Sequence, residues 1–497
     1  MNVNAAAPYR PAGPLNIATA LQPYDGPWNA RLAAHLLRRA GFGGTPEDIA
    51  RNAAMPAASA VDALIHYSKD NSLPGAPDKL DDGYAQQRNL FRAAGRAAGG
   101  IDDASLTMQK MEVQKLRQAT NISMLRWWTE RMIKTQAPLQ EKMTLFWHGH
   151  FASSALQKGI TPKEAVDQNW LFRNNALGNV REMTHLVSKD PAMLKYLDNA
   201  RSNKEHPNEN YARELMELFT LGIGNYTESD IRESARAFTG YTILGPLRGG
   251  GFYFNAKDHD YGMKTFLNAR GELTGDDVVE IIFKQPAAPR WFAKKLLNFF
   301  VYNDPEPELI EAFAQVLLKN DFQISPSMST LLRSNVFFSD RAYRSLVKSP
   351  VEFVVGTHQL FDIAEVTPES LGALNRMGQV PFHPPSVKGW DGGATWLNSQ
   401  TVLARENFVN YLVTSQMMTK SSNWLMAGPP PSSKDATEKL IGTILHGDAS
   451  PASAAKLQAY LDGGDASANA MLSGENYEER MRGAAYLTMA MPAYQLN

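Results

Sequence analysis

Apolar residues recur every three or four positions along most of this chain of 497 residues, and this helical spacing constrains its fold more than any other feature. In the segment 28–39, WNARLAAHLLRR, the leucines and alanines fall on one side of a helix. A glycine-rich stretch at 41–44 then ends that helix, and Thr45 with Pro46 begins the next one with a cap and a proline in the first turn. The same reasoning predicts further helices over 58–68, 106–136, 161–187, 190–199, 208–221, 227–239, 275–301, 306–319, 325–334, 348–362, 368–377 and 401–419.

Two regions break the helical pattern. The runs 252–255 and 264–267 are short and aromatic or β-branched, which predicts a small β-hairpin around the turn between them. The stretch 380–398 is rich in proline, glycine and tryptophan and predicts an ordered loop. We therefore expect a mainly α fold, with a large multi-helix body, a small β-hairpin insertion and a Pro/Gly/Trp-rich loop. The predicted divisions are a flexible N-terminal segment at 1–27, a main helical domain carrying the site at 28–420 and a small C-terminal helical cap at 421–497.

The composition excludes several classes of function. Basic and acidic residues number 50 and 51, and no basic block stands out, which argues against nucleic acid and anionic membrane surfaces as partners. The chain has no cysteine, so disulfides, thiolate metal ligands and a cysteine nucleophile are excluded. No apolar run reaches about 18 residues, so we expect no membrane span. A P-loop, a G-x-S-x-G elbow and an H-E-x-x-H motif are also missing, which weakens nucleotide-dependent, serine-hydrolase and zincin interpretations.

The segment 146–151, FWHGHF, carries the sharpest candidate residues, His148 and His150. Histidines two positions apart on a continuous helix point in different directions and cannot share one ligand. Gly149 between them favours a helix end at that point, where the two imidazoles would converge. Neutral imidazole is the commonest metal ligand and the usual acid or base at neutral pH. The alternative is a pair of histidines that form hydrogen bonds in a buried helix terminus.

The helix predicted over 208–221 has a polar stripe and an apolar one. Asn210, Arg213, Glu214 and Glu217 fall on the first, and Tyr211 falls on the second with the leucines. Two carboxylates one turn apart can hold a cation, or one can act as a base while the other stays ionised. The alternative is a solvated helix face with local ion pairs to Arg213.

Two further polar groups follow in the non-helical regions. A histidine flanked by acids, His259 before Asp260 in the hairpin turn, can be oriented by them, although a plain polar turn has the same pattern. In the loop at 380–398, tryptophans beside polar residues suit sugar rings or aromatic ligands, and the alternative is that both indoles fill the core beneath the loop. The candidate substrate-binding residues of this loop are His383, Lys388, Trp390 and Trp396.

Taken together, seven segments resemble the large bacterial family called domain of unknown function 1800. They are LLRRAGFG (37–44), FWHGHF (146–151), MLKYLDN (193–199), NENYARELMELFTLG (208–222), ARAFTGY (235–241), HDYG (259–262) and HPPSVKGW (383–390). The resemblance implies a bacterial, often exported protein, commonly encoded beside a sulfatase-like companion, and it implies no settled activity. It also implies that the histidine, Asn-Glu and His-Asp segments belong to the family pattern.

The location of the protein stays open in the sequence. The resemblance implies a periplasmic or secreted protein, but the start of the chain lacks the apolar core of a signal peptide. The alanines at 5–7 resemble the tail of a cleavage region, and a native disordered start is the alternative. An exported setting would favour a polar or polymeric substrate such as a polysaccharide.

Three functional hypotheses follow. The first is a metal-dependent enzyme, a hydrolase or an oxidoreductase, in which a divalent Zn, Mn or Fe ion activates water or oxygen. Its proposed metal ligands are His148, His150, Glu214, Glu217, His259 and Asp260, its catalytic residues His148, Glu214, Arg213 and Asn210, and its substrate contacts Tyr211, His383, Lys388, Trp390 and Trp396. The second is a metal-free acid–base polysaccharide lyase that uses His148, Asn210, Tyr211 and Arg213. The third is a non-catalytic binding or assembly protein that contacts the sulfatase-like companion through the tryptophan loop.

Overall fold

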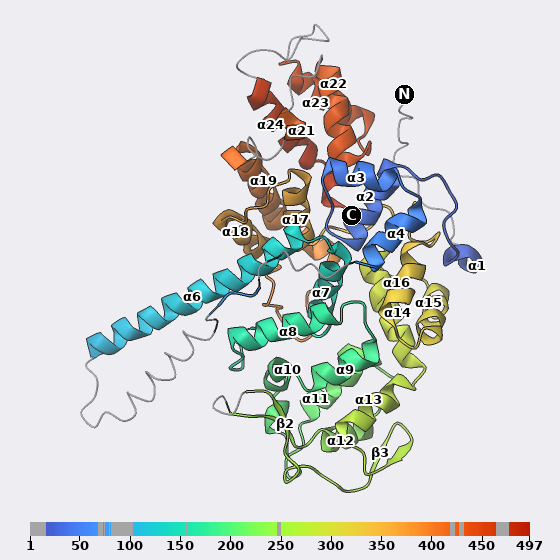
Figure 1. Cartoon of the computed structure of the whole chain (residues 1–497), viewed down its shortest axis with the longest axis vertical. Helices are drawn as coiled ribbons and strands as arrows, with labels where there is room; N and C mark the ends of the chain where they lie inside the picture. Colours follow the sequence, from blue (N-terminus) through green and yellow to red (C-terminus); the bar gives the residue numbers. More distant parts are fainter. Residues whose placement is uncertain are drawn as a thin grey trace.

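The predicted helical character is confirmed by the computed structural model, which describes residues 16–67, 73, 75–78, 80, 103–155, 157–245, 250–417, 423–426, 432–463 and 477–497 (Figure 1). The helices before the first strand are α1 (Ile17–Ala20), α2 (Ala30–Ala40), α3 (Pro46–Ala53), α4 (Ala57–Ile65), α6 (Asp103–Lys134), α7 (Pro138–His150), α8 (Pro162–Asn174), α9 (Val180–Ser188), α10 (Pro191–Tyr196), the 3-10 helix η1 (Asn199–Arg201), α11 (Glu209–Glu214), the π-helical turn η2 (Leu215–Thr220) and α12 (Glu228–Ala237). Those after the strands are α13 (Gly275–Phe283), α14 (Ala287–Phe300), α15 (Pro307–Lys319), α16 (Ile324–Leu332), α17 (Pro350–Leu360), α18 (Pro368–Met377), η4 (Gly393–Trp396), α19 (Ser399–Thr414), α21 (Asn423–Met426), α22 (Ser433–Leu440), η5 (Ile441–Leu445), α23 (Pro451–Leu461), α24 (Tyr477–Met489) and α25 (Pro492–Gln495).

Local sequence signals set many helix starts. Thr45 accepts a hydrogen bond from the backbone of Asp48, and the Asp48 side chain accepts one from Thr45 in return, which makes a capping box at the start of α3. Thr161, Thr227 and Thr274 begin α8, α12 and α13 in the same way. Because these caps satisfy backbone N–H groups that the helix itself leaves free, they fix where each helix starts.

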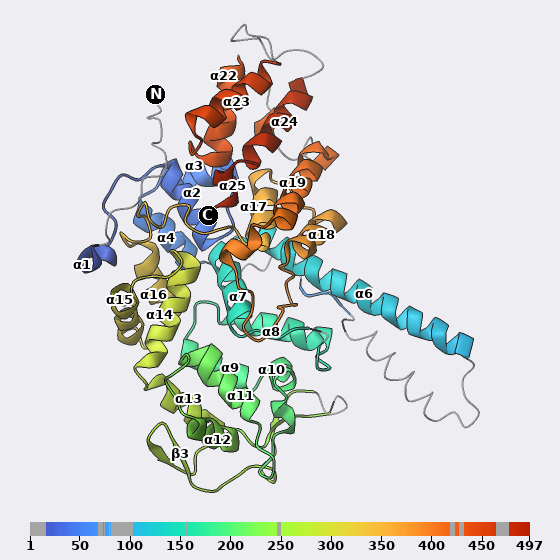
Figure 2. The ribbon, with the colours of Figure 1, turned by 180° about the vertical axis from the view of Figure 1, so that it is seen from behind.

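The helices form an elongated body in which segments distant in sequence meet. The C-terminal helices α22, α23 and α24 lie at one end, and α9 to α13 with the strands lie at the other (Figures 1 and 2). Helix α6 projects sideways from the body in both views. Its inner end packs on α7, α8 and α17, so these four helices surround the middle of the molecule.

The β structure differs in pairing from the single hairpin that the sequence predicts. Strand β2 (Phe252–Phe254) pairs antiparallel with β1 (Tyr241–Ile243), and β3 (Lys264–Phe266) pairs with β4 (Ala269–Gly271). The turn between β3 and β4 places Leu267 and Asn268 at positive φ, the geometry of a tight hairpin turn. The predicted pairing of 252–255 with 264–267 is therefore wrong, because each run finds a closer partner in the chain.

A buried ion network holds the central helices together. Glu141 on α7 is fully buried, and its two oxygens accept hydrogen bonds from Arg173 on α8 at 2.6 and 2.9 Å. Trp128 on α6 donates to the same carboxylate at 3.0 Å, and Arg131 lies 3.5 Å away. Burial alone would raise the pKa of Glu141, but Arg173, then Arg131 and Trp128, outweigh it and lower that pKa. The carboxylate thus stays charged and fixes α7, which carries the histidine segment.

The ends of the chain contact the body. Of the predicted flexible segment 1–27, residues 1–15 lie outside the described residues, and the remainder contains α1 and a backbone hydrogen bond from Tyr24 to Arg333. At the other end, Asn497 donates to the carbonyl of Leu346, and α24 packs against α19.

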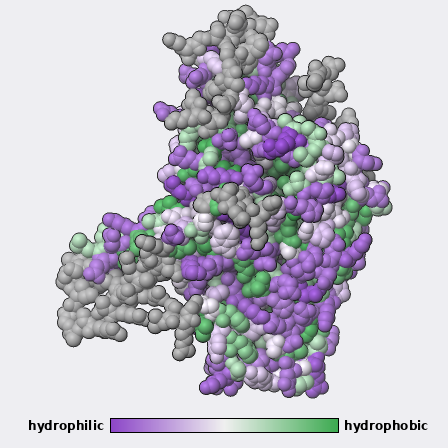
Figure 3. All heavy atoms as spheres, viewed as in Figure 1, coloured by the Kyte–Doolittle hydropathy of each residue, from purple (hydrophilic) through white to green (hydrophobic). Residues whose placement is uncertain are grey.

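The hydropathy of one face is mixed, with polar and apolar residues interspersed (Figure 3). None of the helices in the described part of the chain is both long and apolar enough to cross a membrane.

Candidate functional site

Helix α7 does not end at Gly149, which corrects the expectation from the sequence. It continues to His150, and the backbone N–H of Phe151 still donates to the carbonyl of Trp147 at 2.8 Å. His148 and His150 therefore point to different sides of one helix and do not converge.

His148 is a buried packing residue. Its Nε2 accepts a hydrogen bond from the backbone N–H of Phe382 at 3.0 Å, and its ring lies edge-on to Trp128. Burial, and then the nearby His383, lower the pKa of His148 to about 3, so the imidazole is neutral at pH 7. Because its Nε2 lone pair is already used, the proposed catalytic and metal-binding roles of His148 have no support in this geometry.

His150 is also buried and neutral, but one of its nitrogens is unused. Its Nε2 bonds to the carbonyl of Phe219 at 2.9 Å, which makes Nε2 the protonated nitrogen. Nδ1 is then a hydrogen-bond acceptor, and it is buried without a partner among the described residues. Burial, and then Lys295, lower the pKa of His150 to about 3.

The proposed carboxylate pair lies elsewhere, on α11 and η2. Glu214 and Glu217 are partly exposed, and burial followed by the charge of Glu217 raises the pKa of Glu214. Glu217 accepts a hydrogen bond from the hydroxyl of Tyr226 at 2.8 Å. Arg213 forms a two-pronged surface ion pair with Glu228, with both distances 2.9 Å.

The other candidates of this segment do not join the pair. Asn210 is exposed. Tyr211 is buried in the core, where its hydroxyl donates to Ser188 at 2.8 Å. A substrate contact by Tyr211 therefore has no support in this geometry, since its side chain is buried.

His259 and Asp260 belong to a third place in the molecule. The Nδ1 of His259 bonds to the carbonyl of Thr239 at 2.8 Å, so this nitrogen carries the proton. Asp260 forms an ion pair with Arg236 at 2.7 Å. Both residues fix the loop between β2 and β3 against the end of α12.

The six proposed metal ligands therefore do not form one set. Nowhere in the described ranges do three or more histidine, aspartate or glutamate side chains lie together in a way that could hold a metal ion. The physical reason is that the imidazoles are desolvated and bonded to backbone groups, while the carboxylates face solvent or arginines. A metal centre built from these residues therefore stays a prediction, and the structure does not bring its proposed ligands together.

A cleft of about 250 Å³ instead brings together the end of α7, helix α14 and the tryptophan loop. The residues that line it include Gly149, His150, Lys295, Asn298, Asn303, Glu352, Lys388, Trp390, Asp391 and Trp396. Of the predicted substrate contacts, Lys388, Trp390 and Trp396 thus line one cleft with His150. His383 does not, because its Nε2 bonds to Asn121 on α6 at 2.6 Å.

The tryptophan loop reaches α7 through a close backbone approach. Gly389 has φ of +83°, and a Cβ atom there would strike the carbonyl of Gly149. This contact seats Trp390, whose ring centroid lies 5.7 Å from that of His148. Trp390 and Trp396 are both partly exposed, so each ring packs on the protein and still presents a surface to the cleft.

The cleft is lined by two lysines, Lys295 and Lys388, and by two carboxylates, Glu352 and Asp391, which pair with Lys142 and Lys388 respectively. Lys295 is partly buried, and no ion pair or hydrogen bond of its ammonium is found among the described residues; it lies 4.7 Å from the Trp291 ring centroid. Burial, then Lys294 and Lys388, lower its pKa. Lys388 pairs with Asp391 at 2.7 Å at the rim.

Sequence reasoning missed Lys295, Asn298 and Asn303. The sequence does contain one indication of Lys295. It follows Phe292 by three positions and so falls at the edge of the apolar stripe of α14. A lysine at such a position is either neutralised or exposed to a ligand. Only the fold shows that this edge faces the histidine helix.

Comparison with known families supports the resemblance in the sequence. The family model described as protein of unknown function (DUF1800) matches residues 35–496, which is nearly the whole chain. Comparisons with curated proteins and with solved structures gave no match. The match spans the histidine helix, α14 and the tryptophan loop, so the cleft lies wholly within the family region. The chain therefore belongs to the DUF1800 family of proteins of unknown function.

Proposed function

We propose that this chain binds an acidic polysaccharide in the cleft between α7, α14 and the tryptophan loop, and cleaves it as a metal-independent lyase. The observation that carries the proposal is the position of Lys295, a partly buried ammonium group without a carboxylate partner among the described residues, beside two partly exposed indoles. Sugar rings stack on indole faces, and an uncompensated cation in a cleft attracts an anionic ligand.

The polar lining supports a sugar rather than a purely apolar ligand. Asn298 and Asn303 supply amide groups, and the buried Nδ1 of His150 is an acceptor for a sugar hydroxyl. Lys388 at the rim adds a second cation whose pairing with Asp391 is exposed and therefore weak. A uronate residue would pair with the rim cation Lys388 through its carboxylate and meet the amides through its hydroxyls, which leaves the Lys295 amine free to act as a base.

The lowered pKa of Lys295 supports base chemistry. Its neutral amine would take the proton on the carbon next to the uronate carboxylate, and the electron pair of that C–H bond would form a carbon–carbon double bond. The glycosidic C–O bond at the neighbouring carbon would break, and the leaving oxygen would take a proton from Lys388 or from water. The products are an unsaturated uronate end and a sugar hydroxyl, so atoms and electrons balance without an oxidant.

The test is incubation of the full chain with polygalacturonate, alginate or hyaluronan, followed by the ultraviolet absorbance of unsaturated ends. We expect product with at least one of them and none with neutral amylose. Lys295→Ala should lower product formation by about 100-fold or more, because a positioned base contributes that much. Activity should also rise as pH rises through the lowered pKa of Lys295, since only the neutral amine accepts a proton.

Matched variants separate binding from chemistry. Trp390→Ala should weaken binding of the polysaccharide by about tenfold in calorimetry, because one stacking face is lost. Lys319→Ala, an exposed lysine on α15, should change neither binding nor product. Binding without product would overturn the lyase step and favour the non-catalytic binding protein. Failure of every acidic polysaccharide to bind the folded chain would overturn the whole proposal.

The metal-dependent enzyme, the exported location and the sulfatase-like companion stay proposals. Elemental analysis of the purified chain tests the first: a bound Zn, Mn or Fe ion, or lyase activity lost to a chelator, would contradict the metal-independent step. Fractionation of the source bacterium tests the location. Co-purification with the companion, compared between the wild type and Trp390→Ala, tests an assembly role of the loop.

A further inference from the structure

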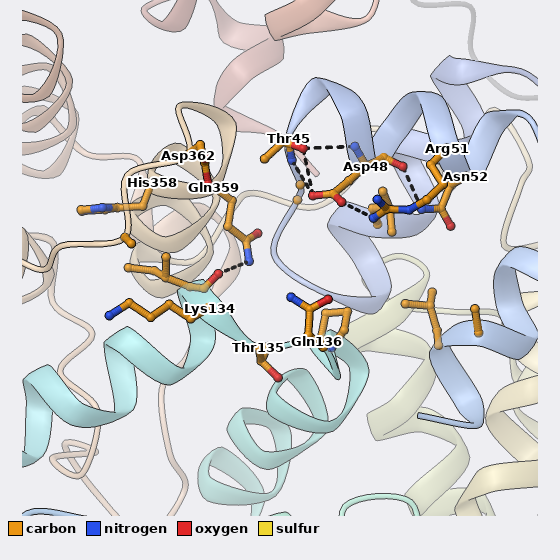
Figure 4. A pocket seen from close by; sticks show the side chains of 18 of the residues that line it. Thr45, Asp48, Arg51, Asn52, Lys134, Thr135, Gln136, His358, Gln359 and Asp362 are labelled. Atoms are coloured by element: carbon orange, nitrogen blue, oxygen red, sulfur yellow. Dashed lines mark hydrogen bonds and ion pairs between the residues drawn. The ribbon is translucent and has the colours of Figure 1, made fainter. Parts of the chain in front are cut away.

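A second cavity, larger than the tryptophan cleft, lies where α3, the junction of α6 with α7, and the end of α17 meet. Its volume is about 430 Å³. Figure 4 shows Gln359 and Asp362 on one side of it, Thr45 and Asp48 on the opposite side, and the segment 134–136 along another wall. The polar groups that line it are Thr45, Asp48, Arg51, Asn52, Lys134, Thr135, Gln136, His358, Gln359 and Asp362.

The amide of Gln359 is held in one orientation. Its Nε2 donates to the carbonyls of Met132 and Ile133, at 3.2 Å each, in the last turn of α6. The amide oxygen must then point the other way, toward Gly43, where a Cβ atom would lie 3.7 Å from it. That oxygen is buried and accepts no hydrogen bond from any described residue. Leaving a buried amide oxygen without a hydrogen bond costs free energy, so a ligand that donates a hydrogen bond to this oxygen would be favoured.

Asp362 lies on the same side of the cavity as Gln359, and it is exposed (Figure 4). Asp362 follows the end of α17 with φ of +51°, and this left-handed backbone conformation restricts where its side chain can lie. Burial, and then the negative charges of Asp48 and Glu47, raise the pKa of Asp362. Within the described ranges its side chain forms neither an ion pair nor a hydrogen bond.

Neither Arg51 nor Lys134, the cationic side chains of the cavity, pairs with Asp362. Arg51 is paired with Asp48, which also accepts hydrogen bonds from the backbone and hydroxyl of Thr45. Lys134 is exposed, and in Figure 4 its chain extends away from Thr45 and Asp48. An amide oxygen and a carboxylate therefore line a polar cavity large enough for a sugar ring, and no residue in the described part of the chain donates a hydrogen bond to either.

We propose that this cavity binds a small ligand with a primary ammonium group beside hydroxyls, of the chemical class of an amino sugar. The ammonium group donates to the Gln359 oxygen and pairs with the Asp362 carboxylate. Thr45, Asn52 and Thr135 offer hydroxyl and amide groups to the hydroxyls of the ring. This site is separate from the tryptophan cleft and does not depend on the lyase proposal.

The test is calorimetric titration of the full chain with glucosamine, N-acetylglucosamine and glucose. We expect glucosamine to bind and the two neutral sugars to bind at least about tenfold more weakly, because each lacks the charged donor. Asp362→Asn should weaken glucosamine binding by about tenfold, and Gln359→Met, which keeps the volume but removes the acceptor, should weaken it similarly.

Controls keep the test decisive. Asp304→Asn changes another exposed aspartate at positive φ, φ of +52°, and should leave glucosamine binding unchanged. Trp390→Ala should also leave it unchanged, which separates this site from the polysaccharide cleft. Equal binding of all three sugars, no binding of glucosamine, or wild-type affinity in Asp362→Asn would overturn the proposal. Competition of potassium ions with glucosamine at equal concentration would overturn it in favour of an inorganic cation site.

Discussion

Replacing Glu141 by glutamine tests whether the buried ion network fixes α7 and, through it, the cleft. Glutamine keeps the volume of the side chain but removes its negative charge, and it turns an N–H₂ group toward donors that need an acceptor. Two guanidinium groups would remain, those of Arg173 and Arg131, whose side chains are 1% and 5% exposed.

The size of the loss follows from this burial. Removing one partner of a buried ion pair costs about 3–5 kcal/mol, because the other charge is left uncompensated in the interior. A folded domain is stable by about 5–15 kcal/mol, so Glu141→Gln should remove roughly a fifth or more of that free energy of unfolding. The carboxylate is bonded by three side chains from two other helices, which places the loss toward the upper end of the range.

Urea unfolding followed by circular dichroism measures this effect. We expect a lower midpoint with an unchanged slope, since the area exposed on unfolding stays the same. Glu112→Gln, an exposed residue on α6, should change the free energy of unfolding by less than about 0.5 kcal/mol. In a double-mutant cycle, Arg173→Met should recover part of the loss in Glu141→Gln, because it removes one stranded charge. A loss below about 1 kcal/mol, or strict additivity of the two changes, would refute the reasoning.

Three further predictions concern pH and the loop. Burial raises the pKa of Asp190, the cap of α10, to about 7, so as pH rises the folded state keeps this proton up to a higher pH than the unfolded state does. The free energy of unfolding should therefore fall as pH rises from about 4 to about 7. Asp190→Asn should flatten that fall in urea midpoints measured across this range. Burial alone would lower the pKa of His185, but hydrogen bonds to Asp276 and Glu280 raise it. The stabilisation should be below about 1 kcal/mol, because the side chains of Asp276 and Glu280 are 49% and 44% exposed. It should be present at pH below the unfolded pKa and lost as pH rises through the folded one, and thermal melts of His185→Ala should lack this step. Gly389→Ala should abolish polysaccharide binding in calorimetry, because its Cβ atom strikes the carbonyl of Gly149, whereas Gly378→Ala, at similar positive φ with open space around it, should cost stability but leave binding intact. Wild-type binding by Gly389→Ala would show that the loop does not need its close approach to α7.

Helical spacing and caps in the sequence predict most of the fold, and the pairing of the strands shows where such prediction stops. Segment 252–255 has the composition of a strand, but composition does not say which neighbour it meets. The structure pairs it with 241–243, a segment just after the predicted helix 227–239 for which the sequence pattern predicts no strand. Strand pairing depends on which edges the packed helices bring together, so it is decided by contacts between segments and not by propensity.

The sequence by itself determined the helical fold and the family segments, and it named the histidine helix and the tryptophan loop as candidate sites. Only the tertiary structure decided that His148 is a packing residue, that the carboxylates of α11 and η2 lie apart from the imidazoles, and that Lys295 joins Trp390 and His150 in one cleft. The physical reason is that helix formation depends on neighbours three or four positions away, which the sequence displays directly. The state of an imidazole or an ammonium group depends instead on burial and on partners from distant segments, and these exist only once the chain has packed.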